Sequence, residues 1–209
     1  KKYGVVICRN DVEVAQMVEM GLVQPIDAGD NGFSLYGEEK VKGVQPHTVS
    51  AAISAFNPSW DEEGDFDAAF GRAVEFAGSI LEREIIRARG VVLAKSIVLE
   101  AICSATDPRV IILDRFCPWT EQVVEASKEA LYVLFPSETG DWRIQCVPDA
   151  LGSFGKRKAL PASWGGKRAA ELAALTGVPD AVFCHAGLFI AGATSKEGVL
   201  EMAKQALAS

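Results

Sequence analysis

The sequence predicts an α/β (α+β) fold, in which a helical N-terminal segment precedes a mixed β-sheet domain with flanking helices. Two observations predict it. Apolar residues recur at helical spacing through about the first hundred positions, and short apolar runs typical of buried strands begin only after Asp107-Pro108. With 209 residues, 49% of them hydrophobic and 23% charged, the chain can bury one substantial core or two small ones.

Helices account for the N-terminal segment. A first helix is expected to end near Pro25–Asp27, where a run of Gly, Asn and Asp allows a sharp turn. A short apolar helix covers Thr48–Phe56 and stops at the following Asn-Pro. The longest periodic stretch, Asp65–Cys103, predicts a long helix without caps or, if Gly90 breaks it, a helix pair.

Strands and shorter helices alternate in the C-terminal part. Gly140-Asp141 precedes a stretch that alternates with period two, which indicates a hairpin. Helices are expected to begin at Thr120, to span 168–175 before Gly177, and to run from Ser195 to Leu207. The expected strands are residues 110–113, 131–135, 142–147, 181–184 and 188–190.

This pattern divides the chain into three parts. Residues 1–32 end in an acidic turn, residues 33–107 form connecting helices, and residues 108–209 form the α/β domain. The first residue is Lys rather than Met, so we expect a trimmed chain or a fragment, in which a site built partly from upstream residues is incomplete.

Composition excludes several classes of protein. The chain carries 21 basic and 28 acidic residues, so its formal net charge is 21 − 28 = −7, which argues against polyanion binding over the whole surface. The five cysteines form no C-x-x-C pair, which indicates neither a disulfide framework nor a structural zinc site and fits a reducing, cytoplasmic location. No run of 18 apolar residues exists, so no membrane-spanning helix is predicted.

Two carboxylates form the first candidate site. Asp27 and Asp30 stand three residues apart in a Gly-rich turn at the end of a predicted helix, which is how ligands for hard metal ions are often presented. Taken alone, the ordinary interpretation is favoured, in which Asp and Asn make turns at a helix end.

A basic, Gly-rich loop forms the second candidate. Between Asp149 and Glu171 there are five basic residues and no acidic one, with Trp164 as a stacking surface. This composition suits a phosphate or a nucleotide strand, and equally a solvated loop that balances acidic helices.

The third candidate is His185, at the end of a predicted strand and ahead of a helix that opens at Ser195-Lys196. A histidine beside a helix N-terminus is a plausible anion contact, although a lone histidine is more often structural. Trp60, Trp119 and Trp142 are interpreted as packing residues. No nucleophile or phosphate-loop motif is present, so no catalytic residue is assigned.

Read together, several segments resemble the Myg exonuclease family, a branch of the DHH phosphoesterase superfamily, over essentially the whole chain. The segments that carry the resemblance are Val23-Gln-Pro-Ile-Asp-Ala-Gly-Asp-Asn-Gly32, Ile53-Ser-Ala-Phe-Asn-Pro-Ser-Trp60, Trp142-Arg-Ile-Gln-Cys-Val-Pro148, Arg157-Lys-Ala-Leu-Pro161, Trp164-Gly-Gly-Lys-Arg168 and Phe183-Cys-His-Ala-Gly-Leu-Phe-Ile-Ala-Gly192.

The resemblance implies a metal-dependent phosphodiesterase or 3′–5′ RNA exonuclease. It implies manganese or another divalent metal in the intact protein, with Asp30 as the preferred ligand and Asp27 as the alternate. The other metal-ligand motifs of the superfamily do not occur in this sequence. The chain therefore resembles mainly the substrate-binding lobe, and alone it is expected to be inactive.

The same resemblance implies contacts to an RNA or oligonucleotide substrate. The residues assigned to them are His185, Arg157, Lys156, Lys167, Arg168, Arg143 and Lys196. No membrane partner is expected, and a homodimer is left open. The alternatives are a non-catalytic nucleic-acid or nucleotide-binding module and a small-molecule phosphoesterase.

Overall fold

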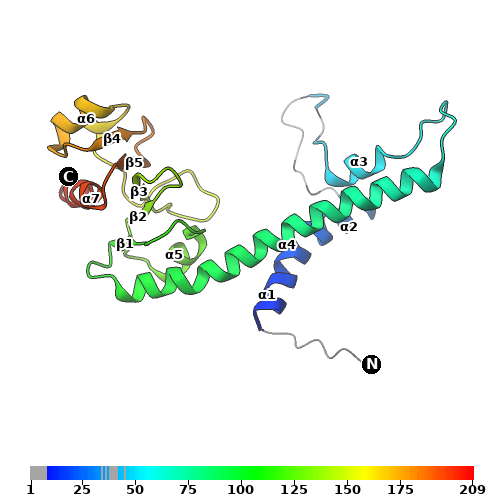
Figure 1. Ribbon diagram of the computed structural model, residues 1–209, viewed down its shortest axis with the longest axis horizontal. Helices are drawn as coiled ribbons and strands as arrows, with labels where there is room; N and C mark the ends of the chain where they lie inside the picture. The colour runs from blue at the N-terminus through cyan, green and yellow to red at the C-terminus, as the bar shows by residue number, and fades with distance from the viewer. Residues whose placement is uncertain (1–8, 34, 36, 38–41, 45) are drawn as a thin grey trace. The chain divides into compact units, whose positions relative to one another are not determined.

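The computed structural model describes residues 9–33, 35, 37, 42–44 and 46–209, and it shows two compact units (Figure 1). The first unit ends at Val92 and the second begins at Leu93, inside one long helix. Each unit is described by itself. The expected division of the chain at residues 32 and 107 concerns functional lobes and stays a prediction.

A continuous helical segment opens the first unit. It consists of α1 (Arg9–Val18), a π-helical turn (Glu19–Val23) and α2 (Gln24–Asp30). Pro25 lies in the first turn of α2, where the hydrogen bonding changes from the π-helical to the α-helical pattern. A missing backbone N–H costs the helix least stability in its first turn. The predicted end near Pro25–Asp27 is therefore wrong by about one turn: the segment ends at Asp30, and Gly32 turns the chain at φ +80°.

The other helices of this unit begin at side-chain caps. Helix α3 (Val49–Ser54) starts after Thr48, whose Oγ1 accepts a hydrogen bond from the Ala51 N–H at 3.1 Å. Helix α4 (Phe66–Ser104) is a single helix of 39 residues, and the Asp65 carboxylate accepts from the N–H groups of two residues in its first turn at 3.0 Å each. Gly90 does not break α4, so the predicted single long helix is correct and the helix pair is not. The prediction that the helix has no cap is wrong, because Asp65 caps its N-terminus.

Packing between α1 and α4 gives this unit its small core. Val14 and Val18 of α1 are buried against Ala88 and Val92 of α4. Nearer the start of α4, Phe76 packs on Phe56 with ring centroids 5.3 Å apart.

A five-stranded mixed sheet forms the centre of the second unit and confirms the predicted α/β class. Its spatial order is β1-β2-β3-β5-β4; β1 pairs with β2 in parallel, and the other neighbours are antiparallel. Leu188 has φ +57° and lies in the turn before β5, so the predicted strand at 188–190 starts two residues too early. The strands are β1 (Val110–Ile112), β2 (Tyr132–Pro136), β3 (Trp142–Cys146), β4 (Ala181–Cys184) and β5 (Ile190–Ala193).

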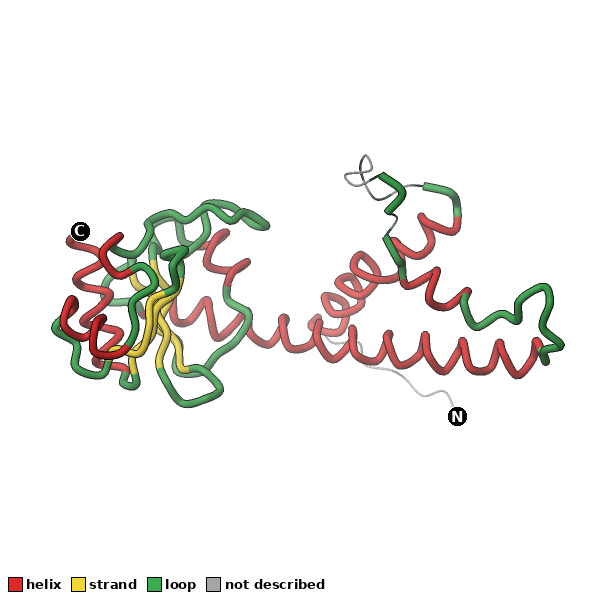
Figure 2. The backbone as a smooth tube through the Cα atoms, turned by 90° about the horizontal axis from the view of Figure 1, so that it is seen from above, coloured by secondary structure: helices red, strands yellow, loops and turns green. Residues whose placement is uncertain are grey.

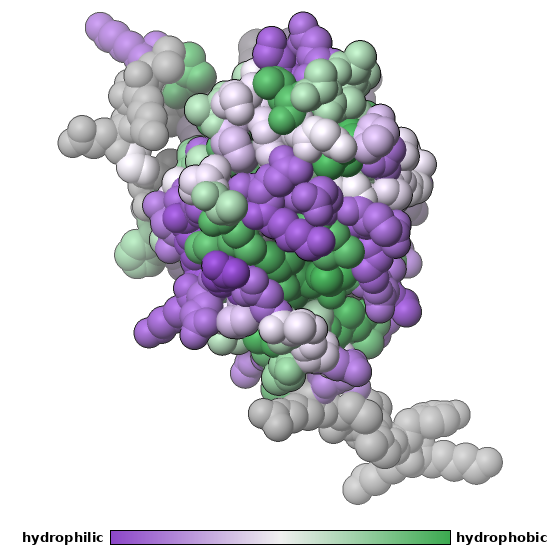
Figure 3. Space-filling view, turned by 90° about the vertical axis from the view of Figure 1, so that its left-hand side faces the viewer, coloured by the Kyte–Doolittle hydropathy of each residue, from purple (hydrophilic) through white to green (hydrophobic). Residues whose placement is uncertain are grey.

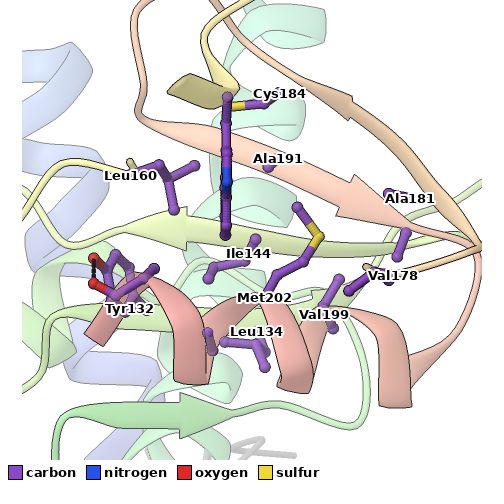
Figure 4. Packing of buried hydrophobic residues seen from close by; sticks show 14 of the residues in the cluster. Tyr132, Leu134, Ile144, Leu160, Val178, Ala181, Cys184, Ala191, Val199 and Met202 are labelled. Carbon is purple, nitrogen blue, oxygen red and sulfur yellow. Dashed lines mark hydrogen bonds between the residues drawn. The ribbon is translucent and has the colours of Figure 1, made fainter. Parts of the chain in front are cut away.

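Helices lie on both sides of this sheet (Figure 2). One face is covered by α6 (Ala169–Thr176) and α7 (Lys196–Ala208) over a cluster drawn from β2 to β5. Figure 4 shows side chains of this cluster between the strands and α7. On the other face, α5 (Thr120–Ala126) and the end of α4 cover side chains of β1 and β2. This second cluster includes no residue of β3, β4 or β5. The described helices therefore leave half of that face uncovered.

Candidate functional site

Two arginines lie in one row across the uncovered half of the sheet. Strand pairing sets Arg143 of β3 opposite Gly192 of β5, Gly192 opposite Phe183 of β4, and Phe183 opposite Arg168 in an isolated bridge. Residues directly opposite one another in antiparallel strands carry their side chains on the same face. We call these four residues the arginine row.

Two contacts hold the guanidinium of Arg143 within this row. It stacks over the Phe183 ring at 5.1 Å from the centroid and lies 3.3 Å from the Asp141 carboxylate, and its side chain is 17% exposed. A Cβ on Gly192 would lie 2.5 Å from the Arg143 Nη1, so only glycine leaves space for this arrangement. Cation–π stacking and the ion pair together fix the direction of the charge.

The imidazole of His185 is exposed beside the arginine row. His185 follows Phe183 by two residues, and its N–H donates to the Ile190 carbonyl at 2.9 Å, so the ladder continues and the imidazole lies on the same face as Phe183. Its Nδ1 accepts from the Gly187 N–H at 2.9 Å. The neutral ring therefore carries its proton on Nε2, as a donor that the rest of the hairpin does not use.

Backbone strain is concentrated at the same place. Among the described residues, the non-glycine residues with positive φ are Ala169 (+40°) and Leu188 (+57°). Ala169 directly follows Arg168, and Leu188 closes the hairpin that presents His185. Strain of this kind persists where the surrounding structure fixes it and is frequent at functional sites.

Two lysines lie at the margin of this group. The Lys167 carbonyl accepts from the Cys184 N–H at 2.9 Å, which fixes Lys167 next to the His185 hairpin, and its Nζ lies 3.5 Å from Glu171. The pKa of Asp149 is lowered, chiefly by the hydrogen bond from Ser153 and to a lesser extent by the charge of Lys156. The structure thus brings Arg143, Arg168 and His185 together, with the Lys167 backbone beside the His185 hairpin and Lys156 near Cys146 at the end of β3.

Arg157 lies elsewhere, at the end of α5. Its guanidinium donates to the carbonyls of Val124 and Ala130 at 3.0 Å each, and also to the carbonyl of Ser127. The carbonyls of Val124 and Ser127 lie at the end of α5, where a helix leaves carbonyls without a partner, and Ala130 lies in the segment that follows. The contact predicted between Arg157 and a substrate stays a prediction, but its nitrogens are already used within the fold.

Replacing Arg157 by alanine should therefore lower stability. We expect the free energy of unfolding to fall by about 2 kcal/mol, because three partly buried carbonyls lose a charged donor. Denaturant titration measures this loss, with Arg87→Ala as a matched control, since Arg87 makes only an exposed pair with Glu84. A variant as stable as the parent would contradict the capping role.

Lys196 and the start of α7 lie on the other face of the sheet. The Lys196 Nζ is 3.3 Å from Asp114 and 5.1 Å from the Trp142 ring centroid. The Asp180 carboxylate occupies the helix N-terminus, accepting from the Ser195 N–H at 2.8 Å and from the hydroxyls of Ser195 and Thr194. The expected anion contact at this helix is therefore already made by a carboxylate of the chain itself.

Two tryptophans differ from their predicted roles. Trp164 is 3% exposed within the cluster under α6 and α7, so it cannot stack on a base. Trp60 is 96% exposed and packs on no core. The aromatic residue that contacts Arg143 is Phe183, and no local pattern in the sequence indicates it because only strand pairing sets it beside Arg143.

The two predicted metal ligands lie on α2 rather than in a turn. Asp27 and Asp30 are exposed and border an open hollow of about 570 Å³ between α2, α3 and α4. The Asp27 Oδ1 also accepts from the Asn31 side chain at 3.3 Å. In the described part of the chain, no group of three His, Cys, Asp or Glu residues could hold a metal ion. Two carboxylates alone do not fit a metal centre, so no chemical step is assigned through one.

A second hollow in the sheet-containing unit is mainly apolar. It measures about 420 Å³ and lies between the end of α4, β1 and α7, lined by Val110, Ile112 and Leu200 among others. In the space-filling view of this end of the chain, hydrophobic residues form a patch with hydrophilic ones around it (Figure 3). Lys204, the basic residue of the hollow, pairs with Glu201 at 3.3 Å, so this hollow is a poor phosphate site.

Comparisons with known proteins agree with the sequence resemblance. The model of the MYG1 exonuclease family, described as an uncharacterised protein family (UPF0160), matches residues 7–207. No solved structure matches the chain. None of the described helices is long and apolar enough to cross a membrane.

Curated relatives match most of this chain. The MYG1 protein of Saccharomyces cerevisiae is 37% identical over 207 residues, which cover 89% of this chain and 61% of the relative. The MYG1 exonuclease of Homo sapiens is 33% identical and that of Rattus norvegicus 32%; each match covers 89% of this chain, and 53% and 52% of those relatives respectively. The chain thus spans about half to three-fifths of the length of these relatives, and the match over almost all of its residues shows that it belongs to the MYG1 exonuclease family.

Proposed function

We propose that this chain supplies the substrate-binding part of a metal-dependent phosphodiesterase, a 3′–5′ exonuclease that acts on RNA or short oligonucleotides. The observation that carries the proposal is the arginine row together with the exposed His185. Guanidinium and imidazole N–H groups on one face match the oxygens of a phosphodiester. Membership of an exonuclease family supports the same substrate class.

Each residue of the face has a distinct role in this proposal. Arg143, oriented by Asp141 and Phe183, donates to one phosphate, and Arg168 at the other end of the row donates to the next. His185 donates through Nε2 beside them. The exposed ring of Phe189, 4.6 Å from the imidazole, offers a surface on which a base can stack.

Manganese or another divalent metal is proposed for the intact protein. Asp30, or alternatively Asp27, would contribute one ligand, and the remaining ligands would come from outside the described residues. The family's longer chains leave room for them, since the match covers 61% or less of the three relatives compared above. A cytoplasmic location is part of the same proposal.

Binding of a short, fluorescently labelled single-stranded RNA tests the proposed face. We expect Arg143→Ala, Arg168→Ala and His185→Ala each to weaken binding by about fivefold to tenfold, and the arginine variants to reduce its salt dependence by about one unit of slope each. Arg109→Ala is the matched control, because Arg109 is exposed and paired with Asp107 at 2.7 Å. Unchanged affinity in all three variants would exclude this face.

Activity distinguishes the exonuclease from the second candidate, a non-catalytic nucleic-acid or nucleotide-binding module. The two isolated carboxylates favour that alternative for the chain alone. We expect a full-length family protein with manganese to degrade single-stranded RNA, and the 209-residue chain to bind RNA without degrading it. Metal-dependent turnover by the 209-residue chain would overturn the account of missing ligands. Binding of a mononucleotide as tight as that of RNA would instead favour a small-molecule phosphoesterase.

A further inference from the structure

A second row of side chains lies on the same face of the sheet as the arginine row. Strand pairing sets Gln145 of β3 between Val133 of β2 and Ile190 of β5. The His185 N–H donates to the Ile190 carbonyl at 2.9 Å, so His185 continues the row beyond Ile190. Gln145 follows Arg143 by two residues, and side chains two residues apart on a strand lie on one face. We call Val133, Gln145, Ile190 and His185 the glutamine row.

The side-chain amide of Gln145 has no role within the described fold. Gln145 is partly buried, and its neighbours Val133 and Ile190 in the adjacent strands have no polar atom in their side chains. None of the described residues forms a hydrogen bond with this amide. No fully buried side-chain nitrogen or oxygen lacks a partner in the described part of the chain, so the amide reaches solvent on the open face. It is therefore available to a ligand.

This amide lies between the positions proposed for a phosphate and for a base. Arg143 is proposed to bind the phosphate, and the ring of Phe189 is proposed to stack on the base. The Cys146 N–H donates to the Phe189 carbonyl at 2.8 Å, so Phe189 lies opposite Cys146, one residue past Gln145 on β3. Residues 143–146 span about 10 Å of strand. Because the sugar joins phosphate and base in a nucleotide, the ribose meets the glutamine row.

Resting on the proposed function, we infer that Gln145 is a specificity-determining residue that recognises the ribose 2′-hydroxyl of a bound nucleotide. The amide carbonyl accepts a hydrogen bond and the amide NH₂ donates one, while a hydroxyl does both, so the two groups pair in either direction. The 2′-hydroxyl is the group by which a protein distinguishes RNA from DNA at a given site. The inference narrows the substrate class to ribonucleotides at this position.

Two other parts of a nucleotide match the amide less well. A phosphate oxygen only accepts, and the charged guanidinium of Arg143 is the stronger donor to it. A base edge can pair with both groups of a glutamine amide. However, a base stacked on Phe189 lies past Gln145 along β3. The sugar is the part that remains beside the amide.

Single 2′-deoxy substitutions test the inference with the 209-residue chain. The probes are short, labelled single-stranded RNAs of one sequence, each with one nucleotide in the 2′-deoxy form. We expect one of these substitutions to weaken binding to the parent chain by about fivefold, the effect of losing one hydrogen-bonded contact. Gln145→Met should weaken binding of the unmodified RNA by a similar factor. In Gln145→Met, the same 2′-deoxy substitution should have no further effect.

DNA of the same sequence is the internal control. Methionine has about the length of glutamine and suits the apolar neighbours of position 145, so Gln145→Met should fold like the parent and bind the DNA with unchanged affinity. Gln16→Met is the matched control variant, because Gln16 is exposed on α1 in the other unit. A loss of DNA affinity as large as the loss of RNA affinity would overturn the inference.

The 2′-deoxy series on the parent chain does not depend on the folding of any variant. If no position in the RNA is sensitive, the inference is overturned. It is also overturned if the sensitivity persists in Gln145→Met, since another residue then recognises the hydroxyl. A loss in Gln145→Met that follows the identity of one base would assign the amide to a base edge and would likewise overturn it.

Failure of this inference differs from failure of the proposed function. If Arg143→Ala leaves RNA binding unchanged, this face does not bind RNA and the proposed function fails. If Arg143→Ala weakens the binding of RNA and DNA alike while Gln145→Met changes neither, the phosphate contact stands. Only the role assigned to Gln145 is then overturned.

Discussion

Replacing Gly192 by alanine is expected to weaken RNA binding as much as removing Arg143 itself, by about tenfold. The new Cβ would lie 2.5 Å from the Arg143 Nη1 and 3.0 Å from the Trp142 carbonyl oxygen. The carbonyl belongs to the backbone and cannot give way, so the guanidinium must leave its place over Phe183. Fluorescence anisotropy with a labelled single-stranded RNA measures the change.

A double-mutant cycle makes this prediction specific. If Gly192→Ala acts through the Arg143 guanidinium, it should have little further effect on RNA affinity in an Arg143→Ala background. Gly166→Ser is a useful comparison, because Gly166 lies near the same hairpin but needs glycine for its φ of +74° rather than for space. Fully additive effects of Gly192→Ala and Arg143→Ala would show that the glycine acts independently of the arginine.

Replacing Asp180 by asparagine changes only one atom of the side chain besides hydrogens, yet it should lower the free energy of unfolding by about 2 kcal/mol near neutral pH. The Asp180 carboxylate accepts from the Ser195 N–H, the Ser195 hydroxyl and the Thr194 hydroxyl at the start of α7. Gly198 leaves room for this carboxylate, since a Cβ at position 198 would lie 2.5 Å from the Asp180 Oδ1. Asparagine keeps the shape but loses the charge.

The pH dependence of this loss has a definite sign. Hydrogen bonds from Ser195, which are the main cause, and from Thr194 lower the pKa of Asp180 in the folded protein. The carboxylate therefore contributes stability above its unfolded pKa and loses that contribution as the pH falls through its folded pKa. Denaturant titrations of the parent and of Asp180→Asn should converge in acid, with Asp61→Asn as an exposed control. A difference that persists in acid would contradict this explanation.

Most elements of the fold could be predicted because their signals are local. Helical periodicity identified α4 and the alternation of residues 142–147 identified β3, since each pattern reflects burial of one side of a single element. The π-helical turn before α2 was missed, because a proline in a Gly-rich segment ordinarily predicts a break. The left-handed Leu188 was missed because a leucine at φ +57° has no sequence signature.

The candidate site could be predicted only in part, because it depends on contacts between distant segments. His185 was selected from its surroundings in sequence, whereas Arg143 was assigned only through the resemblance to the Myg exonuclease family. The roles of Phe183 and Gly192 follow from the pairing of β3 with β5 and of β5 with β4, which the sequence does not specify. Conversely, Arg157 looked like part of a basic loop, whereas three carbonyls near α5 use its guanidinium. Charge along a sequence does not distinguish a ligand contact from a helix cap.

The two edge strands of the sheet, β1 and β4, limit how this protein can aggregate. Strand β1 has only three residues, and the outer edge of β4 is partly paired already, through the bridge between Phe183 and Arg168. Short or occupied border strands are poor templates for adding strands from other molecules. Precipitates formed from the folded protein should therefore keep the circular dichroism of helices and should not enhance thioflavin T fluorescence. Assembly would proceed through exposed apolar residues on helices and not through the addition of β-strands.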